Sequence, residues 1–395
     1  MRDVGTIVRG IRTPIIKEGD NLAQIVVDSV IKASKSEHFE IEDKDVIAVT
    51  EAVVGISEGN YATLDQIALD VKNKMNSDHI GIVFPILSRN RFAVLLSAIA
   101  RATKKITLLS SYPSDEVGND ILYKEDLLKY NVNPSSDTIS EKEYKEKFGH
   151  FKHMFTGVNM YEVYRDLVLK EGCEFEMVFS NKPETILNYT KTVINCDIHT
   201  RLETKERLLK CGAEKVLMMS DILNKSINGS GYSPYGLLGS NRSTAERVKL
   251  FPRTGDVLVK KIQQLMKEKT GKLVEVMVYG DGAFKDPVGK IWELADPVVS
   301  PAYTSGLEGS PNEIKLKYFS ENKLKDLKGE ELKEAMKNEI RAKDKELKGT
   351  MASQGTTPRR YTDLLGSLCD LTSGSGDKGT PVVLVQRYFT NYSND

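Results

Sequence analysis

The chain has 395 residues, 40% of them hydrophobic, which is enough to bury a large core and predicts two domains rather than one. Its 56 basic and 56 acidic residues balance to a formal net charge of zero, so the composition gives no electrostatic footprint for nucleic acid or for an anionic membrane. With no signal-peptide core, no apolar run of about 18 residues and four widely spaced cysteines, the sequence predicts a cytoplasmic protein without a membrane span.

The first 75 residues show one strand pattern between two helical patterns. Apolar residues recur at helical spacing over residues 21–35 and again over residues 64–75. Between them, the short β-branched run at residues 45–50 is typical of a buried strand. We expect these elements to begin a mixed α/β unit.

From residue 79 onward, strand and helix patterns alternate regularly. This rhythm predicts a doubly wound, Rossmann-like parallel sheet over residues 76–225. Ligands bind such sheets beyond the carboxyl ends of the strands, where polar residues follow the predicted strands here. The resulting candidates for substrate contacts are Ser88, Arg89, Asn90, Arg91 and His199. For His199 a structural role is the competing interpretation, because a lone histidine at a strand end is more often structural.

The remainder of the chain returns to mixed patterns after a Gly/Ser-rich joint. Helices are predicted over residues 244–249, 256–267 and 361–370, and strands over residues 272–279 and 381–386. Residues 321–348 are rich in Lys and Glu with apolar residues on one side, which predicts a solvated amphipathic helix. No repeat of fixed period appears in the sequence, which excludes solenoids and propellers.

Residues 374–379 (GSGDKG) match the dinucleotide-binding pattern G-x-G-x-x-G. That fingerprint requires a strand before the loop and a helix after it, whereas here the predicted helix comes first and the predicted strand follows. The sequence therefore argues against a nicotinamide site. Two alternatives stay open, namely a loop whose amides wrap an anion and a plain connection between helix and strand.

A glycine turn with two aspartates follows the strand predicted at residues 272–279. In the run YGDGAFKDP, Asp281 and Asp286 lie beyond the strand end, where carboxylates can hold Mg²⁺ or Mn²⁺ beside a phosphate. An ordinary Asp-Gly turn with solvated carboxylates is the competing interpretation.

Three separated stretches at the two ends of the chain carry further motifs. They are TPIIKEGDNL (13–22) with SEG (57–59), GLLGSN (236–241) with YGDG (279–282), and DLLGSL (363–368) with GTPVVLV (379–385). In this order they resemble the KEGDDL, SKAEGR, AGIDxSN, ITDTxG and C-terminal glycine-loop motifs of the coenzyme F-420:L-glutamate ligase (F-420-0 γ-glutamyl ligase) family. The resemblance implies a γ-glutamyl-ligase scaffold over residues 1–75 and 226–395, interrupted by the Rossmann-like insert over residues 76–225.

The resemblance also implies a homodimeric enzyme that uses GTP, or alternatively ATP, and Mg²⁺ or Mn²⁺ to join L-glutamate to the carboxylate of a cofactor. Position by position, it places Asp281 on the family's metal-binding aspartate, and the strand-end argument adds Asp286. The residues that it places against the nucleotide are Thr13, Pro14, Ile15, Ile16, Asn241, Ser373, Gly374, Ser375, Gly376 and Gly379.

Two positions depart from the family pattern. The lysine of SKAEGR corresponds to Ile56, and the aspartate of AGIDxSN, a metal ligand in the family, corresponds to Leu238. In a ligase, Arg89 or Arg91 from the insert could replace the missing cation. Two alternatives to the ligase stay open: a catalytically silent ligand-binding protein of the same fold, and a nucleotide-binding oxidoreductase or other enzyme that uses the insert.

Overall fold

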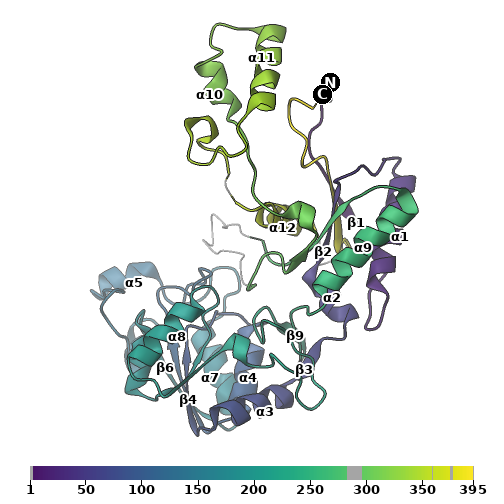
Figure 1. Ribbon diagram of the computed structural model, residues 1–395. Helices are drawn as coiled ribbons and strands as arrows, with labels where there is room; N and C mark the ends of the chain where they lie inside the picture. Colours follow the sequence, from purple (N-terminus) through teal and green to yellow (C-terminus); the bar gives the residue numbers. More distant parts are fainter. Residues whose placement is uncertain (1–2, 283–295, 358, 374–376, 395) are drawn as a thin grey trace.

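The computed structural model describes residues 3–282, 296–357, 359–373 and 377–394 (Figure 1). Within these residues the strands form two five-stranded sheets and one three-stranded sheet. None of the described helices combines the length and the apolar character that crossing a bilayer requires. The fold is α/β, as the sequence predicts.

One five-stranded sheet is mixed and joins strands from both ends of the chain. Its order is β1 (Ile7–Ile11), β13 (Val382–Gln386), β2 (Val46–Thr50), β11 (Glu275–Tyr279) and β12 (Ala302–Tyr303). β2 and β11 pair in parallel, whereas the other neighbours pair antiparallel. The predicted strands at residues 45–50, 272–279 and 381–386 are therefore β2, β11 and β13, the central strands of this sheet.

Helices bury both faces of the mixed sheet. α1 (Leu22–Ser36) and α9 (Gly255–Thr270) cover the face that carries Ile47 and Val276. α12 (Tyr361–Thr372) covers the opposite face, which carries Ala48. Because side chains alternate along a strand, strands covered on both faces are apolar at successive central positions, and this explains the apolar runs in the sequence.

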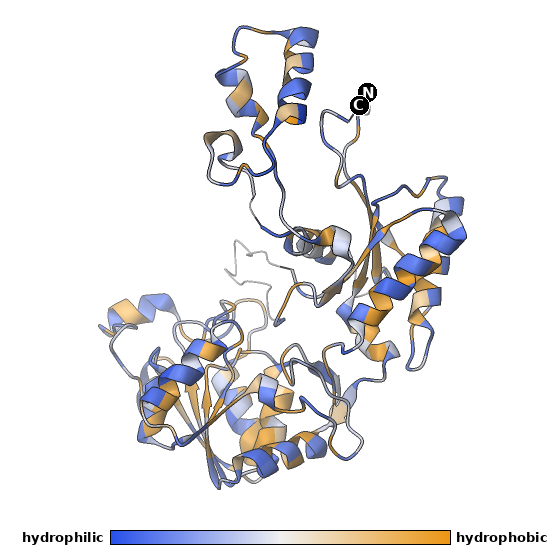
Figure 2. Cartoon of the chain, in the orientation of Figure 1, coloured by the Kyte–Doolittle hydropathy of each residue, from blue (hydrophilic) through white to orange (hydrophobic). Residues whose placement is uncertain are grey.

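The second five-stranded sheet is wholly parallel. Its order is β6 (Glu174–Phe179), β5 (Lys105–Ser110), β4 (His79–Val83), β7 (Thr192–Asn195) and β8 (Lys215–Met218). One face packs against α3 (Leu64–Met75), α4 (Phe92–Arg101) and α7 (Met160–Lys170), and the other against α8 (Arg201–Lys210) and the 3-10 helix η1 (Pro183–Asn188). Figure 2 shows apolar strands inside this layer and a polar outer face on α8, whereas α4 is largely apolar and buried.

A small antiparallel sheet and several short helices complete the description. The small sheet has the order β3 (Tyr61–Thr63), β10 (Arg247–Lys249) and β9 (Asn241–Thr244). The remaining helices are α2 (Glu51–Ser57), α5 (Lys124–Lys129), α6 (Glu141–Lys147), α10 (Leu316–Glu321), α11 (Gly329–Ala342), η2 (Met219–Asp221), η3 (Ser305–Leu307) and η4 (Met351–Ser353). The helix predicted over residues 244–249 is wrong, because this stretch contains the end of β9, a turn and β10, which pairs with β3 and β9.

The Lys/Glu-rich segment does not form the single helix predicted over residues 321–348. It forms α10 and α11 with a turn between them (Figure 1), and Gly329, the first residue of α11, adopts a positive φ of 56°. The two helices contact each other and bury Leu324, Met336 and Ile340 in a small core of their own. The apolar side of the pattern is therefore satisfied by folding the segment back on itself, which periodicity alone does not show.

The division into a scaffold and an insert over residues 76–225 remains a prediction, and protein fragments can test it. The core of the parallel sheet also contains Leu64 and Ile67 of α3, together with Leu237 and Val248. We therefore expect a fragment of residues 60–251 to melt cooperatively and at a higher temperature than a fragment of residues 76–225, because the shorter fragment exposes apolar surface. Equal melting temperatures in calorimetry would contradict this expectation.

Candidate active site

Two parallel strands of the mixed sheet end side by side and are followed by acidic residues. β2 and β11 pair in register up to Thr50 and Tyr279. Glu51 comes next as the first residue of α2, and Asp281 follows β11 after Gly280. A Cβ atom at position 280 would collide with the carboxylate of Asp296, so the turn requires glycine for this close approach. The two strand ends and residue 296 thus bring three carboxylates to one place.

A cation from the parallel sheet reaches into this acidic cluster. Arg91, in the loop between β4 and α4, places one guanidinium nitrogen 2.6 Å from Asp281 and the other 2.8 Å from Asp296. The backbone N–H of Asp281 also donates to the Asp296 carboxylate over 2.7 Å. The side chain of Asp296 is fully buried and that of Arg91 is 13% exposed. Arg91 therefore links the end of a parallel strand to the end of a mixed-sheet strand.

A second buried ion pair lies beside the first. Lys249 of β10 places its Nζ 3.2 Å from the Glu51 carboxylate, and both side chains are 6% exposed. The strand partner of Lys249 in the small sheet is Asn241. Electrostatic interactions with Asp296 and Arg91 also act on Glu51, so the two ion pairs belong to one cluster.

The end of α12, which leads into the predicted phosphate loop, borders the same cluster. The backbone N–H of Gly282 donates to the carboxylate of Asp370, on α12, over 3.0 Å. The hydroxyl of Tyr279 is buried without a hydrogen-bond partner in the described part of the chain, although Ser373 faces it. An unpaired buried hydroxyl is costly unless something else satisfies it, so this one is available to an additional partner.

The cluster carries more carboxylates than cations. Its carboxylates are Glu51, Asp281, Asp296 and Asp370, and its cations are Arg91 and Lys249. Burial, reinforced by Asp296, raises the pKa of Asp281 to about 7. Burial likewise raises the pKa of Glu51 and of Asp370. Burial opposes the charge of Arg91, but Asp296 and Asp281 outweigh it and raise the pKa of the guanidinium. A group of carboxylates with raised pKa values is typical of a site that binds a cation or moves a proton.

The donor set fits Mg²⁺ or Mn²⁺ in the way that phosphate-binding sites use these ions. Such ions are commonly held by one or two carboxylates, with phosphate and water oxygens completing the shell. Asp281 and Asp296 provide the two carboxylates, and a phosphate group would provide further oxygens. Across the residues that the structure describes, no group of three or more His, Cys, Asp or Glu side chains is arranged to hold a metal by itself.

The structure places the other predicted nucleotide residues in two regions. Thr13, Pro14, Ile15 and Ile16 follow β1, where Ile16 is buried and Ile15 is 88% exposed. This turn continues to Gly19, whose N–H donates to the Ser57 carbonyl at the end of α2. Ser373 directly follows α12 and Gly379 precedes β13, with Gly379 at a positive φ of 65°. The predicted residues Gly374, Ser375, Gly376 and Asp286 lie outside the described residues.

The predicted substrate contacts do not all face the same place. Arg91 enters the acidic cluster, whereas Ser88, Arg89 and Asn90 line a separate cavity. His199 is exposed beyond β7, and its backbone N–H donates to Glu116 over 3.2 Å.

Sequence reasoning missed Glu51, Lys249, Asp296 and Asp370. Of these four residues, only Glu51 had a sequence pattern that could have predicted it as a site residue, because it directly follows a buried apolar strand.

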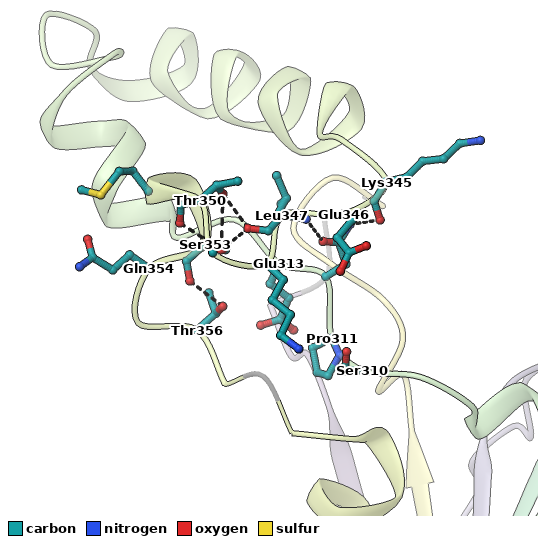
Figure 3. A pocket seen from close by; sticks show the side chains of 14 residues that line it. Ser310, Pro311, Glu313, Lys345, Glu346, Leu347, Thr350, Ser353, Gln354 and Thr356 are labelled. Atoms are coloured by element: carbon teal, nitrogen blue, oxygen red, sulfur yellow. Dashed lines mark hydrogen bonds between the residues drawn. The ribbon is translucent and has the colours of Figure 1, made fainter.

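A separate cavity elsewhere in the chain is of a different kind. A cavity of about 590 Å³ lies in the segment around α10 and α11, between residues 310 and 356 (Figure 3). Its hydroxyl groups bond within their own loop: Thr350 and Ser353 donate to the Leu347 carbonyl, and Thr356 donates to the Ser353 carbonyl. These groups stabilise the loop and are not organised around a ligand.

Comparison with protein families gives an independent result. The family model described as F420-0:Gamma-glutamyl ligase matches residues 10–387, which includes every residue of the acidic cluster. A comparison with curated proteins gave no match. The resemblance of the motifs at the two ends of the chain is thereby confirmed. The chain therefore belongs to the F420-0:gamma-glutamyl ligase family.

Proposed function

We propose that this protein is a nucleotide-dependent amide ligase that joins L-glutamate to the carboxylate of a cofactor-type small molecule. Family membership supports a ligase that acts on a cofactor. The finer assignment rests on the acidic cluster at the ends of β2 and β11, where buried carboxylates and two cations meet. GTP or ATP would be the phosphate donor.

The reaction would proceed in two balanced steps. An oxygen of the acceptor carboxylate takes the terminal phosphoryl group, which gives an acyl phosphate and a nucleoside diphosphate. The glutamate amine then attacks the acyl carbon, the C–N bond forms, and inorganic phosphate leaves with the C–O bond electrons. A bound divalent ion would neutralise phosphate charge.

The residues of the cluster suit this chemistry. Asp281 and Asp296 would hold the metal. Arg91 would be released from them towards the phosphate oxygens, since a guanidinium binds carboxylate and phosphate with the same geometry. Lys249 is held by Glu51 as a second, fixed cation. The buried Tyr279 hydroxyl, which Ser373 faces, would donate to a ligand oxygen, because burial raises its pKa and keeps it protonated.

The positions at which the family pattern is lost support one further candidate, a silent ligand-binding protein. Leu238 is 4% exposed and packs in the core of the parallel sheet, so this position offers no metal ligand. The ligase proposal stands because Asp296 supplies a carboxylate next to this position: Pro297 approaches Gly239, which directly follows Leu238. A homodimer and a cytoplasmic location remain part of the proposal.

A turnover assay tests the proposal. We expect the purified chain, given GTP or ATP with Mn²⁺ or Mg²⁺, to add one glutamyl residue to a deazaflavin or folate acceptor. Mass spectrometry would detect the product, and phosphate release would match it mole for mole. Chelation of the metal should stop both. Nucleotide binding without turnover on any acceptor would favour the silent binder, and no nucleotide binding at all would remove the proposal.

A further inference from the structure

A second cavity, of about 580 Å³, adjoins the loop that carries Arg91. Its polar lining includes Ser88, Arg89, Asn90, Asn119, His153 and Arg242. Leu87 and Met160 add apolar surface. The volume falls within the range of about 300–1,000 Å³ that small-molecule sites occupy, so the cavity has room for an organic ligand and not only for an inorganic ion.

All the ionised side chains that line this cavity are positive. Arg89 and Arg242 are exposed, and no carboxylate in the described part of the chain pairs with either guanidinium. No Asp or Glu lines the cavity. The ring nitrogen Nδ1 of His153 is buried there without a hydrogen-bond partner among the described residues. Two unpaired guanidinium groups and an unsatisfied ring nitrogen are the features of an anion site.

The backbone holds the two arginines on connected segments. The N–H of Arg242 donates to the Asn90 carbonyl over 2.7 Å, which joins β9 to the loop after β4. The N–H of Leu87 donates to the buried Asp115 carboxylate over 2.7 Å, and the N–H of Ser88 donates to the Tyr164 hydroxyl over 3.0 Å. The loop is therefore anchored at several points, which lowers the entropic cost of positioning its side chains for a ligand.

We propose that this cavity binds a small organic phosphate, at a site distinct from the acidic cluster. Charge complementarity favours a phosphate group, because two arginines match the dianion of a phosphate monoester better than the single charge of one carboxylate. The His153 ring and the side-chain amides of Asn90 and Asn119 supply further hydrogen bonds to its oxygens. Leu87 and Met160 contact the organic body. The inference goes beyond the proposed ligation, because it rests on this cavity alone.

Calorimetric titration with phenyl phosphate, in a chelator and without nucleotide, tests the proposal on the full chain. We expect saturable binding that is tighter than that of inorganic phosphate, which lacks an organic body. Arg89→Gln and Arg242→Gln should each weaken it about tenfold or more, since each removes charge-assisted hydrogen bonds. Arg165→Gln is the matched control: it removes a half-exposed guanidinium from α7 outside the cavity and should leave the affinity unchanged.

Three results would overturn the proposal. One is the absence of phenyl phosphate binding to the wild type. Another is unchanged binding in the Arg89→Gln/Arg242→Gln double variant when its melting curve shows a folded protein. The third is tighter binding of glutarate, a dicarboxylate of similar size, than of phenyl phosphate. Since no metal and no nucleotide are present, failure of the ligase proposal would not affect these outcomes.

Discussion

Asp281→Asn is expected to abolish metal-dependent binding of GTP and ATP and, without metal at about pH 8, to raise the melting temperature of the protein. The first effect follows because a hard divalent ion prefers an anionic oxygen and the amide offers a neutral one. Changes in the outer shell of a metal site alone cost about 10–100-fold in affinity, so loss of a direct ligand should cost at least about 100-fold.

The second effect follows from the raised pKa of Asp281. Burial and Asp296 raise it from 3.8 to about 7, so the folded state binds this proton more tightly than the unfolded state does. Ionisation of Asp281 therefore costs stability progressively as the pH rises between these two values. Asparagine does not ionise, so the stability advantage of the variant should be near zero below about pH 4 and largest above about pH 7. Such a pH dependence is typical of a binding site in which a buried charge lowers the stability of the fold but is needed to bind the ligand.

Calorimetric titration of Mn²⁺–GTP and Mn²⁺–ATP, with melting curves across the pH range, measures both effects. Asp326→Asn is a matched control, because it makes the same chemical change at an exposed residue between α10 and α11. It should alter neither nucleotide binding nor the pH dependence. Wild-type affinity in Asp281→Asn would exclude Asp281 as a ligand. A melting temperature below that of the wild type at high pH would show that the ion pair with Arg91 outweighs burial.

Lys249→Met should lower the free energy of unfolding by about 3–5 kcal/mol at neutral pH, because it leaves a buried carboxylate without its partner. Lys249 and Glu51 are each only 6% exposed, so water cannot replace the lost cation. Burial already raises the pKa of Glu51, and loss of Lys249 should raise it further. The folded variant then binds a proton more tightly than the unfolded chain does, so the deficit should shrink as the pH falls towards 5 and grow as it rises.

Urea denaturation with two further variants makes the test specific. In Lys249→Met/Glu51→Leu both charges are replaced by apolar groups, and most of the lost stability should return. Lys269→Met is the control, because it breaks an exposed ion pair. Lys269 lies 2.7 Å from Asp28, and the two side chains are 37% and 58% exposed. The loss of this pair should lower the free energy of unfolding by less than about 1 kcal/mol. A double variant as unstable as the single one would show that Lys249 acts by packing rather than by charge.

Local sequence patterns determined much of the fold. The apolar runs now seen as β2, β11 and β13 identified strands because a strand covered on both faces has no polar alternation to display. The regular alternation of strand and helix from His79 onward identified the parallel sheet for the same local reason. Motif order at the two ends of the chain was enough to suggest the family, which the match over residues 10–387 confirms.

Tertiary structure alone decided which residues share the site. Arg91 meets Asp281 and Asp296 across about half of the chain, and Lys249 meets Glu51 across a similar span. No periodicity encodes such pairs, because they depend on how separate sheets pack and not on local conformation. The same limit explains the errors: residues 244–249 became a strand through pairing with β3, and the segment of α10 and α11 folded back because its apolar residues could bury each other. Local physics thus determined most of the elements, whereas long-range packing determined which charged residues meet.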